Sequence, residues 1–149
     1  MSDTAATPTP AKILVPIDGS PNALRALGFA IALARRAPGT RLELVNAQPP
    51  VGQAVSMFVA RADLKGHHRD AGMQALAPAI AEMERAQVPF GHHIAVGQPA
   101  DVIAGFVREL GCTQVVMGTR GHGSALGLLL GSVATAVVRQ VAVPVTLVK

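Results

Sequence analysis

A glycine-rich segment between two apolar stretches constrains this chain more than any other feature. Gly118 and Gly121 follow the apolar run 115–117, and Gly131 and Ser132 precede a helical pattern. Glycine permits positive φ angles and leaves space for a ligand beside main-chain N–H groups, and a helix N-terminus adds unpaired donors. The segment therefore predicts a strand, a phosphate-binding loop and a helix. A tight turn that holds no ligand is the alternative.

The segment differs from the common nucleotide and hydrolase motifs. It lacks the Lys of a Gly-x-x-x-x-Gly-Lys-Ser/Thr loop, and Gly118, Gly121 and Gly123 do not match the Gly-x-Gly-x-x-Gly fingerprint. In Gly-His-Gly-Ser at 121–124, Gly123 stands where a hydrolase elbow carries its nucleophile. Ser132 has no evident His and Asp partners in the sequence, so we expect no catalytic residues.

Apolar runs and helical periodicity alternate along the chain. Strands are predicted at 13–17, 42–47, 90–96, 113–117 and 143–148, and helices after the first strand and at 64–87, 100–110 and 132–141. Residues 48–63 are expected to be irregular, and Met73, Leu76, Ile80 and Met83 to form one buried stripe. The alternation predicts a doubly wound α/β fold, in which a parallel sheet is covered on both faces and a ligand binds beyond the carboxyl ends of the strands.

The length of 149 residues predicts a single domain with one core. Residues 1–10 lack the basic and apolar regions of a signal peptide, so we expect a disordered tail at 1–11 and the domain at 12–149. The longest apolar stretch, 26–34, is shorter than the roughly 20 residues that a bilayer requires. We therefore expect a soluble protein without a membrane partner.

Charge and cysteine content exclude further classes. The 13 Lys and Arg and 9 Asp and Glu are scattered, and the chain has no Trp or Tyr, so we expect no nucleic-acid partner. A single cysteine, Cys112, excludes an internal disulfide, favours a cytoplasmic location and is expected to be a core residue. Adjacent histidines such as His67 and His68, or His92 and His93, diverge, so we expect no metal site.

The spacing Gly-x2-Gly-x9-Gly-Ser, with the stretches 15–20 and 143–148, resembles the universal stress protein family over about residues 12–149. The resemblance implies an adenine-nucleotide α-hydrolase-like fold with strand order 3-2-1-4-5, in which the loops after strands one and four share a crevice. It also implies that ATP with Mg²⁺ is the ligand of a nucleotide-dependent stress-response or signalling module. The apolar last strand, 143–148, would be exposed at the sheet edge, and the resemblance implies that it forms a homodimer.

The expected ligand-binding residues come from four places in the chain. They are Pro16, Ile17 and Asp18; Ala47; Met117, Gly118, Arg120, Gly121 and His122; and Gly131, Ser132 and Val133. The Asp18 carboxylate suits a ribose, an adenine or a metal ion, although it could instead cap a helix, a role that Ser20 can also take. Through the resemblance, the Ala47 backbone would pair with an adenine edge.

The remaining positions keep more than one interpretation. Met117 suits a base or ribose but also a core. Arg120 suits a phosphate, and His122 and Ser124 lie near the expected phosphates, although all three side chains could be solvent-exposed. A slow ATPase or a nucleotide transferase is the alternative function, but no Lys lies near the motif to clamp a phosphate. An empty glycine loop in a protein that binds only protein partners is a further alternative.

Overall fold

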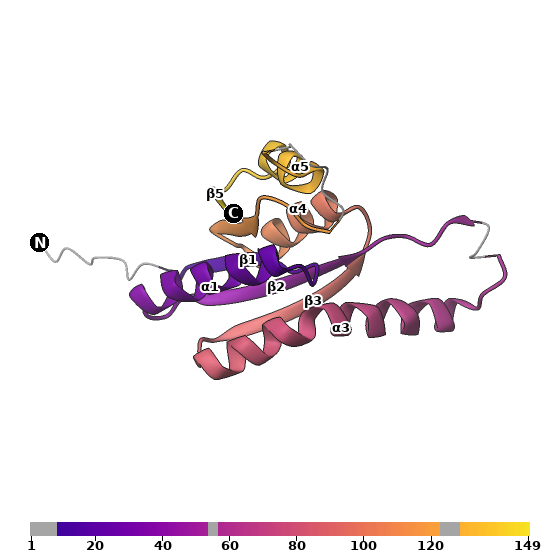
Figure 1. The fold of residues 1–149 in the computed structure, drawn as a ribbon, viewed down its shortest axis with the longest axis horizontal. Coiled ribbons are helices and arrows are strands. Elements are labelled where there is room, and N and C mark those ends of the chain that lie inside the picture. Colours follow the sequence, from indigo (N-terminus) through magenta and orange to yellow (C-terminus); the bar gives the residue numbers. More distant parts are fainter. Residues whose placement is uncertain (1–8, 54–56, 123–128) are drawn as a thin grey trace, which may run out of the picture.

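The computed structural model describes residues 9–53, 57–122 and 129–149. They form a parallel five-stranded sheet in the order β3-β2-β1-β4-β5, with helices on both faces (Figure 1). The elements are β1 Lys12–Pro16, α1 Pro21–Arg36, β2 Arg41–Gln48, α3 Arg61–Ala86, β3 Phe90–Val96, α4 Pro99–Leu110, β4 Gln114–Gly118, α5 Ser132–Gln140 and β5 Val145–Val148. The α/β fold and the strand order expected from the sequence are confirmed.

The central strand β1 contributes to two separate cores. Ile13 and Val15 pack with α1 and α3 on one face of the sheet, whereas Leu14 packs with α4 and α5 on the other. Successive side chains of a strand point to opposite faces, so a strand buried on both faces is apolar throughout. Cys112 is buried in the second core, and this burial raises the pKa of its thiol to about 11.

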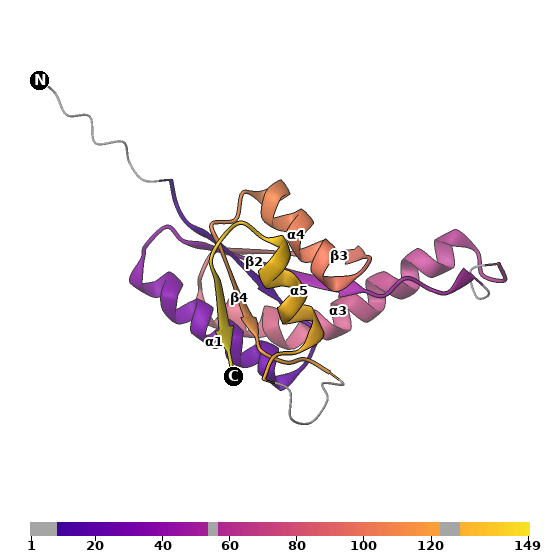
Figure 2. The ribbon, with the colours of Figure 1, turned by 90° about the horizontal axis from the view of Figure 1, so that it is seen from above.

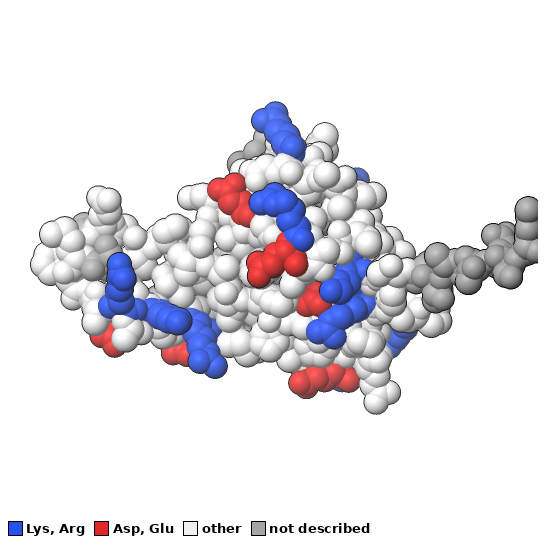
Figure 3. Space-filling view, turned by 180° about the vertical axis from the view of Figure 1, so that it is seen from behind, with Lys and Arg blue, Asp and Glu red and all other residues white. Residues whose placement is uncertain are grey.

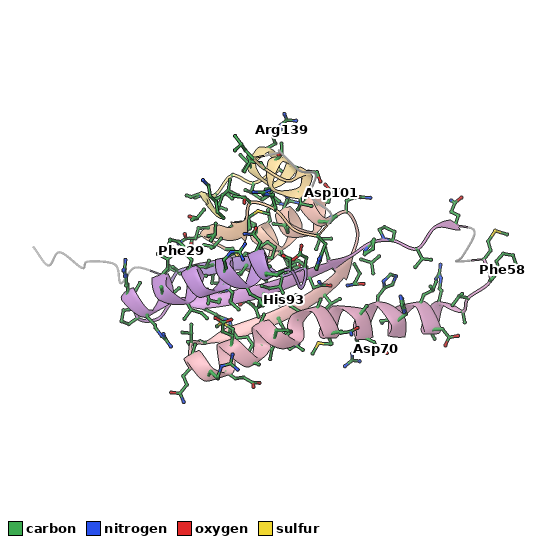
Figure 4. All side chains as sticks on the ribbon, viewed as in Figure 1. Phe29, Phe58, Asp70, His93, Asp101 and Arg139 are labelled. Atoms are coloured by element: carbon green, nitrogen blue, oxygen red, sulfur yellow. The ribbon has the colours of Figure 1, made fainter. Side chains whose placement is uncertain are left out.

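Helix α3 differs most from the prediction. It begins at Arg61 rather than after an irregular stretch to 63, and its first half projects away from the sheet with the connection from β2 (Figure 1). Phe58 lies at the far end of this projection and is 87% exposed (Figure 4). The expected stripe is wrong at Met73, which is exposed. Gly72 faces the sheet instead. Its lack of a side chain matters there, because the Ile94 side chain leaves no room for a Cβ.

The last strand is shorter than predicted. It starts at Val145, and Pro144 precedes it with its carbonyl accepting from the Val115 N–H over 2.9 Å. Proline has no N–H to donate to a ladder, which accounts for the later start. Strand β5 pairs with β4 on one side and lies beside α1 (Figure 2).

A charged cluster lies on β2 and β3. The buried Glu43 carboxylate accepts from Arg41 Nε over 2.6 Å and contacts His93 Nε2 over 2.8 Å, and Gly91 leaves space for it. Burial alone would raise the pKa of Glu43. The hydrogen bonds with His93 and Arg41, with their charges, outweigh it and lower the pKa below its ordinary value.

The described chain is held to the sheet from its start. Residues 1–8 of the expected tail lie outside the described residues, and the Ala11 carbonyl already accepts from the Arg41 N–H over 2.9 Å. On the face opposite that of Figure 1, basic and acidic side chains are interspersed (Figure 3). Among the helices of the described ranges, we find none that is both long and apolar enough to cross a bilayer.

Candidate functional site

A cavity of about 460 Å³ opens at the carboxyl ends of β1, β2 and β4. Its size falls within the range of small-molecule sites, and its position is the one where doubly wound sheets bind ligands. The amino ends of α1, α4 and α5 contribute Ser20, Pro99 and Ser132 to its wall. All three helices therefore direct the positive ends of their dipoles toward this region.

The Asp18 carboxylate joins the two loops that were expected to share a crevice. Its Oδ1 accepts from the Ser20 N–H over 2.9 Å, and its Oδ2 accepts from the His122 N–H over 3.3 Å. A Cβ on residue 121 would collide with Oδ2, so any larger residue at this position would have to displace the carboxylate. Ser20, not Asp18, caps α1, because its hydroxyl accepts from the Ala23 N–H.

The Asn22 side chain fixes the start of the glycine segment from the other side. Its Oδ1 accepts from the Arg120 N–H over 2.9 Å, and its Nδ2 donates to the Val148 carbonyl over 3.1 Å. A Cβ on residue 118 would collide with this amide. Asn22 is buried beside apolar residues of α1, and the sequence analysis did not single it out.

The glycines are explained by close contact rather than by unusual backbone angles. None of Gly118, Gly121 and Gly131 has a positive φ, although the sequence analysis expected glycine there partly for that reason. That expectation is wrong for these three positions. Gly118 and Gly121 instead leave room for the Asn22 amide and the Asp18 carboxylate.

Four N–H groups of the described glycine segment already donate within the protein. The Thr119 N–H donates to the Val148 carbonyl over 2.9 Å, and the Gly131 N–H donates to the Thr119 carbonyl over 2.7 Å. Those of Arg120 and His122 bond the two side chains described above. These four groups are therefore not free to bind a ligand in this conformation.

The amino end of α5 keeps its donors. No side chain of the described residues caps it, and its first intrahelical bond runs from the Thr135 N–H to the Gly131 carbonyl over 3.1 Å. The preceding N–H groups, those of Ser132, Val133 and Ala134, have no partner within the helix, and all three residues line the cavity. Such an end of a helix suits an anion.

The end of β2 presents its backbone to the cavity. The Ile17 N–H donates to the Val45 carbonyl over 2.8 Å, so the main-chain groups of Ala47, two residues later, point toward the same side, beyond the end of β1. The Asn46 side-chain Nδ2 donates to the Ile17 carbonyl over 2.8 Å. The N–H and the carbonyl of Ala47 thus face the cavity, where they could pair with the hydrogen-bonding edge of a base.

All twelve predicted site residues line this cavity, and their contacts with a ligand stay a prediction. Ser124 lies outside the described residues. Eight further residues line the cavity and were not expected from the sequence as ligand contacts: Ser20, Ala23, Val45, Pro49, Pro99, Ile103, Thr119 and Ala134. Pro99 was the most predictable of these, because it opens the helix that follows a strand of the same sheet.

The cavity has an apolar end and a polar end. Val45, Ile103 and Met117 form apolar wall, whereas Arg120, His122 and the amino end of α5 contribute polar groups to the lining. Asp18 is the one carboxylate among the lining residues, and the described residues contain no group of three or more His, Cys, Asp and Glu placed for a metal ion. The arrangement suits a ligand with an apolar ring and an anionic tail.

The chain matches the model of the universal stress protein family over residues 10–149. A universal stress protein of Thermus aquaticus is 34% identical over 138 residues, which cover 92% of this chain and 97% of that one. Matched relatives from mycobacteria are longer, and the match covers 48% of their length.

Solved structures share the fold. A universal stress protein in complex with cAMP matches with a TM-score of 0.69 and 25% identity, covering 95% of this chain and 98% of that one. A universal stress protein from Archaeoglobus fulgidus in complex with dAMP matches with a TM-score of 0.70 and 24% identity, covering 95% and 99%.

Proposed function

Because this chain belongs to the universal stress protein family, we propose that it binds ATP with Mg²⁺ and acts as a nucleotide-dependent stress-response or signalling module. The observation that carries the proposal is the uncapped amino end of α5, which opens into the cavity beside Arg120 and His122. The structural neighbours that hold cAMP and dAMP support an adenine nucleotide as the ligand.

The adenine would occupy the apolar end of the cavity. Ile103 and Met117 provide apolar contact for a base, and the backbone of Ala47 provides a hydrogen-bond donor and an acceptor. No Phe, Trp or Tyr is among the described lining residues, so the base would pack against aliphatic side chains and Met117. The Asp18 side chain lies at the end of β1, where it can accept from a ribose hydroxyl.

The phosphates would lie at the amino end of α5. The N–H groups of Ser132 and Val133 and the Ser132 hydroxyl would donate to phosphate oxygens, and Arg120 and His122 would supply donors from the other side. In this arrangement the main-chain donors to the phosphates come from α5. The glycines contribute by allowing the segment to approach Asp18 and Asn22 closely.

One carboxylate is sufficient for a Mg²⁺ ion that travels with the nucleotide. Mg²⁺ keeps several waters and is bound through phosphates plus one or two carboxylates, and it neutralises phosphate charge. Asp18 is the lining carboxylate that fits this part. Both of its oxygens already accept one N–H each, and each has a further lone pair for a metal-bound water.

We infer that the chain is a binding protein rather than an efficient enzyme. The lining residues include no Lys, and Asp18 is the only carboxylate among them to serve as a base. A slow ATPase or nucleotide transferase is the second candidate function, favoured by the fold. We further propose a cytoplasmic homodimer formed through β5, whose outer edge pairs with no other described strand.

Native mass spectrometry of the purified chain tests both parts of this proposal. We expect the mass of two chains with up to two ATP molecules, and loss of ATP after treatment with a chelator and dialysis. A chain that never carries or takes up an adenine nucleotide at millimolar ATP would contradict the proposal.

A further inference from the structure

A second hollow of about 420 Å³ lies next to the candidate site. The two hollows share the wall formed by residues 119–122, and Ser20 also lines both. Beyond this wall, the second hollow is lined by Asn22 and Arg25 of α1 and by Lys149 after β5. It is thus a separate space that meets the candidate site along one stretch of backbone.

The charged side chains that line the second hollow are all basic. Arg25, Arg120 and Lys149 line it, and its lining residues include no Asp or Glu. Helix α1 begins at this hollow and carries no acidic residue in its first turn. The Asp18 carboxylate lines the candidate site, where it accepts from the Ser20 and His122 N–H groups of the shared wall. These features together create a positive potential in a space whose walls are largely polar.

The geometry orients one of these cations. Arg25 Nε donates to a main-chain oxygen of Lys149 over 3.0 Å, which leaves the two terminal nitrogens of the guanidinium for other acceptors. The Asn22 amide, which lines the same hollow, accepts from the Arg120 N–H and donates to the Val148 carbonyl. A guanidinium positioned in this way matches the paired oxygens of a phosphate group.

We propose that this hollow is a second anion site, which binds a phosphate group separately from the anion at the amino end of α5. Arg120 lies in the wall between the two and can reach a phosphate on either side. The phosphate belongs either to a free polyphosphate anion or to the distal phosphates of the nucleotide. The second source, but not the first, rests on the function proposed above.

Calorimetric titration with inorganic triphosphate at low ionic strength tests the site without a nucleotide. Arg25→Gln should weaken triphosphate binding by about tenfold, because it removes charge-assisted hydrogen bonds. Arg36→Gln is the matched control, since it removes the same charge from the exposed last turn of the same helix. Its affinity should stay within about twofold of the wild type.

Titrations with ATP and AMP separate the two sources. If Arg25→Gln weakens the binding of ATP but not of AMP, the hollow takes the distal phosphates of the nucleotide. If it weakens only inorganic triphosphate, the ligand is a free anion, and this inference stands even when no nucleotide binds. Equal affinities of Arg25→Gln and Arg36→Gln for both triphosphate and ATP, or no binding of either ligand to the wild type, would overturn the proposal.

Discussion

The side-chain amide of Asn22 donates to the carbonyl of Val148 over 3.1 Å, and so ties the start of α1 to the end of the last strand. The oxygen of the same amide holds the Arg120 N–H, and the Thr119 N–H shares the Val148 carbonyl. The glycine segment of the candidate site and the strand proposed for dimerisation therefore share one buried side chain as a hydrogen-bond partner.

We predict that Asn22→Ala destabilises the chain and also weakens ATP binding. The change leaves the Arg120 N–H without its acceptor and Val148 with fewer donors, which should cost about 1–3 kcal/mol of unfolding free energy. Urea unfolding measures the first effect and calorimetry the second. Unchanged values in both measurements would show that the amide does not fix the segment.

The Glu43 cluster predicts a dependence of stability on pH. Glu43→Gln should lower the unfolding free energy near neutral pH by roughly 1–3 kcal/mol, because it weakens the bonds with Arg41 and His93. The folded-state pKa of Glu43 is lowered, so its contribution is complete above the unfolded-state pKa of about 4.3 and is lost as the pH falls through the folded-state pKa.

Urea unfolding of the wild type and of Glu43→Gln over a pH series measures this effect. The difference between them should shrink in acid. Glu109→Gln, which changes an exposed carboxylate on α4, is the control and should have little effect at any pH. A difference that grows as the pH falls would contradict this account of the cluster.

Strand β5 predicts the oligomeric state. Val145→Lys should give a monomer or an insoluble chain, because it places a charge in a strand whose second edge would pair with its copy. Thr146→Pro should have the same effect by disrupting the ladder between β5 and β4, toward which the main-chain groups of residues 144, 146 and 148 point. Light scattering at micromolar concentration measures the mass. A monomeric wild type, or a dimer that both substitutions leave intact, would argue against dimerisation through this strand.

The site composition predicts very slow turnover. With Mg²⁺ present, phosphate release from ATP should be far below the roughly 1–10³ s⁻¹ of ordinary enzymes, because no Lys lines the cavity and Asp18 is already hydrogen-bonded to two N–H groups. A coupled phosphate assay measures the rate. A rate within the ordinary range that Asp18→Ala or Ser132→Ala abolishes would place the chain among the enzymes.

The fold was largely predictable because apolar runs and helical spacing report burial directly. The glycine spacing likewise located the loops that line the cavity. The sequence could not reveal why Gly118 and Gly121 are required, since the reason is contact with Asn22 and Asp18, which are distant in the chain. Met73 was misjudged because the apolar spacing does not show that the neighbouring Gly72, which has no side chain, takes the buried position against Ile94.

Calorimetric titration of ATP with Mg²⁺ into the wild type and into Gly121→Val tests the central claim most directly. Gly105→Ala is a suitable control, because a Cβ at that position meets no neighbour within 4 Å. We predict saturable binding to the wild type and to Gly105→Ala. Binding should be lost in a folded Gly121→Val, since the added side chain displaces Asp18. Equal ATP affinity in all three proteins, or no affinity in any of them, would contradict the account.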